Sequence, residues 1–246
     1  MIANKSILKK HADYFKFSVF GKGIVALCSI KPKSYKSAHK ISDREVERNR
    51  RWLCNVIGVD YKNLVYLHQV HGSRIYEVKL SHIKKSPVGD YDAVISRDKN
   101  IPLAVFSADC LPIFLADRKK SAIALIHAGW RSTLKGIAAK VVRRLESDFD
   151  ICPGELRVGL GASLRKCCFE VSGDFLKKFP DSVIKKDNAL YFDLVKENIR
   201  QLCSSGVKRS NIFDSGYCTS CDNGLFFSYR KEKDTCGRMI SLMMLI

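Results

Sequence analysis

Three residues that can bind a transition metal lie at the ends of apolar segments in the middle of the chain. His71 ends the segment LHQV, Cys110 follows PLAVFSAD, and His127 follows AIALI and precedes AGW. Side chains at the ends of strands, beside glycine, are held on a rigid support and remain open to ligands. The three residues are too far apart in sequence to form a local finger-like loop. A joint site must therefore be assembled by the fold.

Two imidazoles and a thiolate suit zinc or copper. Three protein ligands leave a fourth position open, as in a catalytic zinc site that makes bound water more acidic. A Cys–His pair could instead form a hydrolase dyad in which the thiolate attacks a carbonyl. A cysteine between apolar strands is also commonly a plain core residue. Spacing alone leaves these three interpretations open.

The segment HQVHG contains two histidines, His68 and His71. Side chains alternate between the two faces of a strand, so residues three apart point to opposite sides. They are therefore not expected to bind one metal together. His71, beside Gly72, is the expected ligand, and His68 is expected to orient it or to contact substrate.

Two charged residues accompany these candidates. Arg131 follows Trp130 at the expected start of a helix, where a guanidinium and free N–H groups favour an anion such as phosphate. The alternative is an ordinary surface arginine. Asp109 precedes Cys110 and could hold a substrate hydroxyl, orient a ligand or carry a proton. A nearby metal cation would favour the charged carboxylate and so the first two roles.

The remaining cysteines are expected to be structural thiols. CTSC (218–221) is a single C-x-x-C, whereas a zinc ribbon needs two such pairs. In KCCF (166–169), adjacent Cys167 and Cys168 do not easily share a face. Ten cysteines in 246 residues is below the density of a disulfide scaffold, and no signal peptide is evident. Reduced thiols in the cytoplasm are therefore expected.

Short apolar runs predict a strand-rich chain. Four of them, at 91–96, 102–108, 112–117 and 122–129, are expected to be buried strands of one sheet. Further strands are expected within 18–31, on both sides of Gly72 in 63–78, and at 156–162, 212–218 and 224–230.

Three amphipathic segments predict helices. Residues 42–60 begin with a capping box of Ser42 and Glu45. Residues 131–149 carry one apolar stripe, and 193–207 run from Asp193 to Gly206. Many strands and few helices indicate the α+β class, with sheets packed together and helices outside. No linker or repeat divides the chain, so one domain over 1–246 is expected.

The chain is strongly basic, with 43 lysines and arginines against 25 acidic residues and a net charge of +18. The basic residues are scattered in pairs, without an arginine tract or an RNP-like aromatic pattern. This favours attraction of small anions, such as phosphate-bearing substrates, over a nucleic-acid partner. No apolar stretch is long enough for a transmembrane helix, so no membrane partner is expected.

Seven motifs, taken in order, carry a resemblance to a known family. They are HQVHG, DYDAVIS, PLAVFSADCLPIFLAD, HAGWRSTLKG, GASLRKCCFEV, DLVKENIRQL…GV and CTSC…LFFSYRKE…GR. Over roughly residues 18–245 the chain resembles the laccase-domain family, long named multicopper polyphenol oxidases and now regarded as purine nucleoside phosphorylases. The resemblance implies a β-sandwich core flanked by helices. It also implies that His71, Cys110 and His127 bind a catalytic Zn²⁺, with copper as the alternative metal.

The resemblance further implies a reaction. Adenosine, inosine, guanosine and methylthioadenosine would be cleaved by phosphate to the free base and ribose 1-phosphate, with adenosine deaminase activity beside it. We expect His71, Cys110, His127 and Asp109 to be catalytic, and Arg131 and His68 to contact substrate. Ser107, Ser132, Ala162 and Cys236 replace residues usual in the family, but none of them is a ligand position. A monomer or weak homo-oligomer is expected.

Besides the Cys–His hydrolase, two rival functions remain at this point. Copper-dependent phenol oxidation, the family's older name, is disfavoured because six histidines are too few for a coupled copper cluster that reduces oxygen. A non-enzymatic protein that binds nucleic acid has only the net charge in its support.

Overall fold

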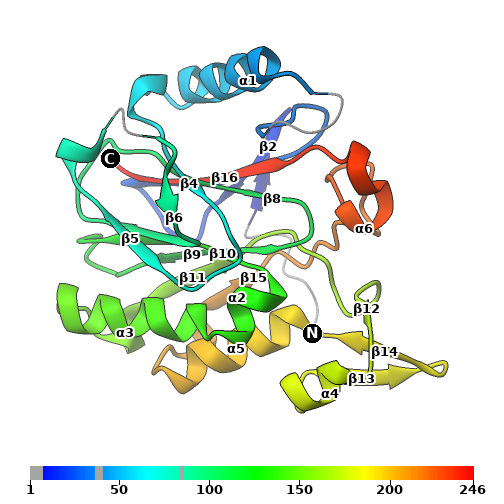
Figure 1. Cartoon of the computed structure of the whole chain (residues 1–246). Coiled ribbons are helices and arrows are strands. Elements are labelled where there is room, and N and C mark those ends of the chain that lie inside the picture. Colours follow the sequence, from blue (N-terminus) through cyan, green and yellow to red (C-terminus); the bar gives the residue numbers. More distant parts are fainter. Residues whose placement is uncertain (1–7, 37–40, 84–85) are drawn as a thin grey trace.

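Two mixed β-sheets lie face to face and helices cover their outer faces (Figure 1). This computed structural model describes residues 8–36, 41–83 and 86–246. Helix α1 (Asp43–Val56) covers one side of the sandwich, and α3 (Ile137–Phe149) and α5 (Leu194–Ser204) cover the other. The predicted α+β class, with a sandwich core flanked by helices, is confirmed.

The first sheet has seven strands in the order β1-β2-β3-β16-β8-β4-β6. All neighbours pair antiparallel except β4, which runs parallel to both β8 and β6. The central strands β3, β16 and β8 are buried along their whole length because apolar layers cover both of their faces. The strands span Leu8–Lys10 (β1), Tyr14–Phe17 (β2), Ile24–Ser29 (β3), Met239–Leu245 (β16), Leu103–Ser107 (β8), Val65–His68 (β4) and Val88–Asp90 (β6).

The second sheet has six strands in the order β15-β11-β9-β10-β7-β5. They span Ile212–Asp214 (β15), Arg157–Leu160 (β11), Leu111–Ala116 (β9), Ile123–Ala128 (β10), Ala93–Ser96 (β7) and Ile75–Val78 (β5). Glu170–Val171 (β12), Ala189–Phe192 (β14) and Val183–Lys186 (β13) form a small third sheet beside the sandwich.

The helices follow the sequence signals closely at their starts. Ser42 accepts a hydrogen bond from the N–H of Glu45, and Asp193 accepts one from the N–H of Lys196. Both residues therefore cap their helices as predicted, with one of the two hydrogen bonds of the expected capping box present. The short helices span Trp130–Leu134 (α2), Asp174–Lys178 (α4) and Tyr229–Glu232 (α6). Single 3-10 turns occupy Tyr61–Asn63, Leu80–His82, Pro153–Glu155, Arg209–Asn211 and Lys233–Thr235.

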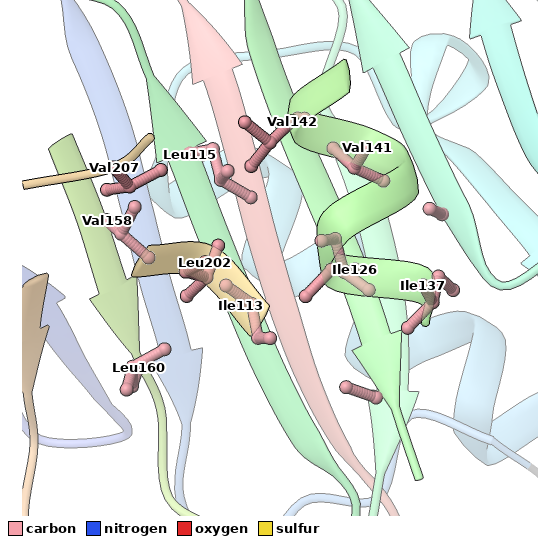
Figure 2. Close-up of a cluster of buried hydrophobic side chains, with 14 of the residues drawn as sticks. Ile113, Leu115, Ile126, Ile137, Val141, Val142, Val158, Leu160, Leu202 and Val207 are labelled. Atoms are coloured by element: carbon pink, nitrogen blue, oxygen red, sulfur yellow. The ribbon is translucent and has the colours of Figure 1, made fainter. Parts of the chain in front are cut away.

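Three apolar layers hold the sandwich together. One lies between the two sheets, a second lies under α1, and the third joins the six-stranded sheet to α3 and α5. Figure 2 shows the third layer, where Ile113 and Leu115 of β9 face Val141 and Val142 of α3 and Leu202 of α5. No helix in the described part of the chain is long and apolar enough to cross a membrane.

Four expectations about elements are wrong. The four apolar runs do not form one sheet, because β8 pairs with β16 and β4 in the seven-stranded sheet. The chain then crosses between the sheets in a tight corner at residues 108–110, where Asp109 has a φ of 87°. The helix expected over 131–149 is two helices, because Gly136 adopts a φ of 72° between α2 and α3.

The third and fourth differences concern the end of the chain and the helix ends. Residues 224–230 form a turn leading into α6 rather than a strand, and the closing strand is β16, which the sequence patterns did not reveal. Val56 and Leu134 are apolar residues of the amphipathic segments 42–60 and 131–149 and were expected on their buried faces. Both are exposed, because each is the last residue of its helix.

Candidate functional site

A pocket of about 580 Å³ opens where the ends of strands from both sheets meet. This volume lies in the range of small-molecule sites. His71, Cys110 and His127 line it, together with Asp109 and Arg131. The fold therefore gathers around one cavity five of the six site residues predicted from the sequence.

The three candidate metal ligands form a compact cluster. Their ligand atoms all lie within 4.8 Å of one another, and Cys110 Sγ is 3.7 Å from His71 Nε2. The rings of His71 and His127 meet edge to face at 4.9 Å between centroids. All three residues border the cavity, and His127 is the most buried of them, only 3% exposed. Two imidazole nitrogens and one sulfur at these separations fit a single metal ion.

Strand pairing places two of these residues side by side. His127 lies near the end of β10, opposite Pro112 in β9, and Cys110 directly precedes β9 at the corner between the sheets. His71 comes from the turn after β4 and has a φ of 55°. This left-handed conformation costs energy for a non-glycine residue and persists only where neighbouring contacts enforce it.

Those contacts come from Asp92, a buried residue that the sequence patterns did not single out. Its carboxylate accepts hydrogen bonds from the backbone N–H groups of Val70, His71 and Gly72. The same carboxylate lies 2.8 Å from His127 Nδ1. Because a carboxylate can only accept, Nδ1 carries the proton and Nε2 is left free to bind a metal. One side chain thus positions two of the three ligands.

The environment of Asp92 stabilises its ionised, negatively charged form. Burial raises its pKa, but the hydrogen bond and charge of His127 and the surrounding N–H groups hold the pKa below its usual range. The sequence did contain a signal for Asp92. In the segment DYDAVIS it directly precedes a buried apolar strand, and a buried carboxylate needs a hydrogen-bonding or charged partner.

Replacement of Asp92 by asparagine tests this positioning role. In Asp92→Asn we expect metal affinity to fall by roughly 10- to 100-fold, because the amide no longer fixes the His127 tautomer. Competition with a chelator of known affinity measures the change. Asp90→Asn is the matched control, since the exposed Asp90 carboxylate pairs with the exposed His68 ring and does not line the pocket. Equal affinities for the two variants would refute the role.

Cys110 and His127 are poised as an ion pair when no metal is bound. Burial raises the pKa of Cys110, but the positive His127 and hydrogen bonds from both histidines outweigh it and bring the pKa to about 6. Burial lowers the pKa of His127, but the Cys110 thiolate and Asp92 raise it to about 9. A cation that displaces the His127 proton finds a thiolate already formed.

The alkylation rate of metal-free protein should reveal this thiolate. Because the pKa of Cys110 is lowered, its reaction with iodoacetamide should persist at neutral pH and fall only as pH drops through about 6. Peptide mass spectrometry across a pH series measures the profile. In His127→Gln the profile should move to higher pH, since the main favourable charge is gone. A wild-type midpoint above pH 8 would contradict the ion pair.

Asp109 joins the corner that bears Cys110 to the C-terminal loops through hydrogen bonds. Its carboxylate accepts hydrogen bonds from Thr219 Oγ1 at 2.6 Å, Ser228 Oγ at 2.7 Å and the N–H of Arg230 at 2.6 Å. Both of its oxygens are engaged by donors from the C-terminal loops. These contacts favour a positioning role over the transfer of a proton.

Arg131 borders the cavity, whereas His68 does not. The Arg131 guanidinium stacks 4.4 Å from the ring centroid of Trp130. His68 is exposed and its Nδ1 lies 2.7 Å from Asp90 Oδ1, away from the residues that line the pocket. The structure therefore brings Arg131 to the site and leaves His68 outside it.

The pocket is positively charged beyond Arg131. Among its described lining residues, Asp109 is the one acidic side chain. Four further cationic side chains line it: Lys36, Arg230, Lys233 and Arg238. The overall charge of +18 gave no means of distinguishing these residues from the other basic side chains. Such a cavity concentrates anions.

Comparison with known proteins is consistent with this arrangement. The family model described as "Multi-copper polyphenol oxidoreductase laccase" matches residues 34–246. The chain is 31% identical to "Purine nucleoside phosphorylase YlmD" of Geobacillus stearothermophilus, over 83% of this chain and 81% of that protein. It is 32% identical to "Purine nucleoside phosphorylase SACOL1200" of Staphylococcus aureus, over 86% and 85% of the two chains.

A solved structure shares the fold over almost the whole chain. The crystal structure of YlmD from Geobacillus stearothermophilus superposes with a TM-score of 0.91, 27% identity, and coverage of 97% of this chain and 98% of that one. The family model covers most of the chain and the curated relatives agree with it. The chain therefore belongs to the multi-copper polyphenol oxidoreductase laccase family.

Proposed function

We propose that this protein is a zinc-dependent purine nucleoside phosphorylase. It cleaves adenosine, inosine, guanosine or methylthioadenosine with phosphate, giving the free base and ribose 1-phosphate. The observation that carries the proposal is one cavity in which a His-Cys-His cluster faces five cationic side chains. The names of the relatives, purine nucleoside phosphorylases, support the same reaction class.

The donor set fits zinc. His71, Cys110 and His127 would hold the ion through two nitrogens and one sulfur and leave a coordination position for substrate or water. When bound, the ion supplies Lewis-acid chemistry, polarising a substrate group or acidifying water. Copper would also accept these donors. A coupled copper cluster is not supported, because the described residues hold only this group and a set of four cysteines as candidate metal sites.

The protein's own residues would bind and orient the two substrates. Phe106, Trp130, Phe169 and Tyr229 give the cavity flat apolar surfaces for a purine. The cations would bind phosphate and hold its oxygen against the anomeric carbon, where a new bond forms as the bond to the base breaks. Such positioning removes much of the entropic cost of a two-substrate reaction. Adenosine deamination is proposed for the same cavity.

Arg131 is proposed to bind the phosphate. A charge-assisted hydrogen bond contributes about 1.5–3 kcal/mol, so in Arg131→Ala we expect the KM for phosphate to rise roughly 10- to 100-fold. The KM for inosine should change far less. Arg143→Ala, on the exposed side of α3, is the matched control. A phosphate KM that is unchanged in Arg131→Ala would refute the role.

The proposed reaction is tested by its dependence on phosphate. Inosine and adenosine are incubated with the protein, with and without phosphate, and the free base is measured. Base that forms only with phosphate is the expected result. Base that forms equally without phosphate would overturn phosphorolysis in favour of hydrolysis. Inosine formed from adenosine in the same samples tests the deaminase activity.

The ion pair of Cys110 and His127 favours a second candidate, a Cys–His hydrolase in which the thiolate attacks a carbonyl. A covalent acyl adduct on Cys110, formed by metal-free protein, would support it. We further propose a cytoplasmic monomer or weak homo-oligomer.

A further inference from the structure

Four cysteines from two distant segments meet outside the pocket. Cys167 and Cys168 precede β12, and Cys218 and Cys221 form the CTSC turn near the C-terminus. Their four sulfur atoms all lie within 4.8 Å of one another. We propose that these cysteines form a second metal site, a structural Zn²⁺ site with four thiolate ligands.

The sulfur separations fit one tetrahedral ion. A Zn–S bond of about 2.3 Å places the sulfurs of a tetrahedral site roughly 3.8 Å apart. Cys221 Sγ is 3.5 Å from Cys167 Sγ and 3.4 Å from Cys168 Sγ. These distances are far longer than a disulfide bond of about 2.05 Å. Adjacent Cys167 and Cys168 were not expected to share a face easily, but a turn at residues 166–168 brings both of their sulfurs close to Cys221 Sγ.

Independent contacts hold the two segments in place. Arg165 donates from Nε to the carbonyl of Tyr217 at 3.0 Å, and its guanidinium forms a bidentate pair with Asp214. The N–H of Cys168 donates to the carbonyl of Arg165, which closes the turn that presents both adjacent sulfurs. In the CTSC turn, Asp222 Oδ2 accepts the N–H of Cys218. These contacts join the two segments independently of the four sulfur atoms.

One of the four sulfurs is already surrounded by donors. The Cys218 sulfur accepts hydrogen bonds from backbone N–H groups of Cys221, Arg165 and Ser220. N–H groups directed at a metal-binding sulfur are a common outer-shell support of such sites. Four thiolates in so small a volume would repel one another, and a divalent cation offsets that repulsion.

The site would have a structural role. Four protein ligands fill a tetrahedral zinc and leave no position for substrate. The joined segments carry Leu164 and Phe169, which line the pocket, and Thr219, which donates to Asp109. Zinc at this cluster would therefore tie one wall of the pocket to the corner that bears Cys110.

Metal content separates the two sites. Full-length protein purified with reductant and without added metal is measured by native mass spectrometry and elemental analysis. We expect two zinc ions per chain in wild type, one in Cys218→Ser/Cys221→Ser and one in Cys110→Ala. Cys152→Ser, an exposed cysteine outside both clusters, should retain two. Equal metal content in wild type and the double variant would overturn the four-cysteine site, whatever Cys110→Ala shows.

Thiol protection in wild type gives a second test that needs no variant. Cys167, Cys221 and Cys152 are all exposed. We expect the first two to resist alkylation until a strong chelator is added, whereas Cys152 reacts at once. Equal reactivity of the three before chelation would overturn the proposal. A disulfide among the four cysteines in reductant-treated protein would also overturn it.

Discussion

In Cys110→Ala, kcat/KM for phosphate-dependent nucleoside cleavage should fall by roughly a thousandfold, because a catalytic metal contributes several kcal/mol. Cys110 supplies the sulfur of a three-ligand cluster, so its loss leaves two histidines to hold the ion. The fold should survive, since only one sulfur atom at the edge of the cavity is removed. Steady-state kinetics and thermal unfolding, run side by side, separate the two effects.

The matched control for this variant is Cys152→Ser, which removes an exposed sulfur from outside the pocket. Its kinetics and metal content should equal those of wild type. Full activity in Cys110→Ala would remove the cluster from the mechanism. Loss of activity accompanied by unfolding would instead reassign Cys110 to the core.

Gly129→Ala should also inactivate the site, without removing any ligand. A Cβ at Gly129 would lie 2.9 Å from both Cys110 Sγ and His71 Cδ2. The backbone of Gly129, with φ of −78°, suits any residue, so the cost falls on the two ligands and not on the main chain. A displacement of about 1 Å in a catalytic group can lower the rate roughly a hundredfold. We expect a loss of kcat of that size, together with weaker metal binding.

Gly173→Ala offers the comparison for this steric effect. Gly173 precedes α4, and a Cβ there would meet no atom within 4 Å. Its activity should match wild type. If Gly129→Ala retained wild-type kcat and metal affinity, the close packing of His71 and Cys110 against Gly129 would not matter for function.

The sequence predicted elements and ends of elements better than their arrangement. The caps at Ser42 and Asp193 follow from local hydrogen bonding, and so does the position of His127 near the end of a strand. The assignment of β8 to the wrong sheet has a physical cause. A buried strand is apolar on both faces, so its pattern does not indicate which sheet it joins. The chain enters the seven-stranded sheet between β7 and β8 and leaves it again at the Asp109 corner.

The sequence indicated the site residues whose chemistry is evident from the single residue. It did not indicate those whose role depends on contacts with distant segments. His71, Cys110 and His127 stand out by type and place. Asp92 acts through partners in other segments. The four-cysteine cluster was missed for the same reason, because its two halves are far apart in sequence. A zinc ribbon is recognised by two C-x-x-C motifs, whereas Cys167 and Cys168 are adjacent and form no such motif.

The rate of phosphate-dependent hypoxanthine release from inosine, measured as zinc is returned to metal-free protein, tests the central claim most directly. We predict no release above the blank without metal, recovery of the full rate as zinc is added, and no recovery in Cys110→Ala. Metal-free protein that releases hypoxanthine as fast as the zinc-loaded protein would contradict a catalytic metal at His71, Cys110 and His127.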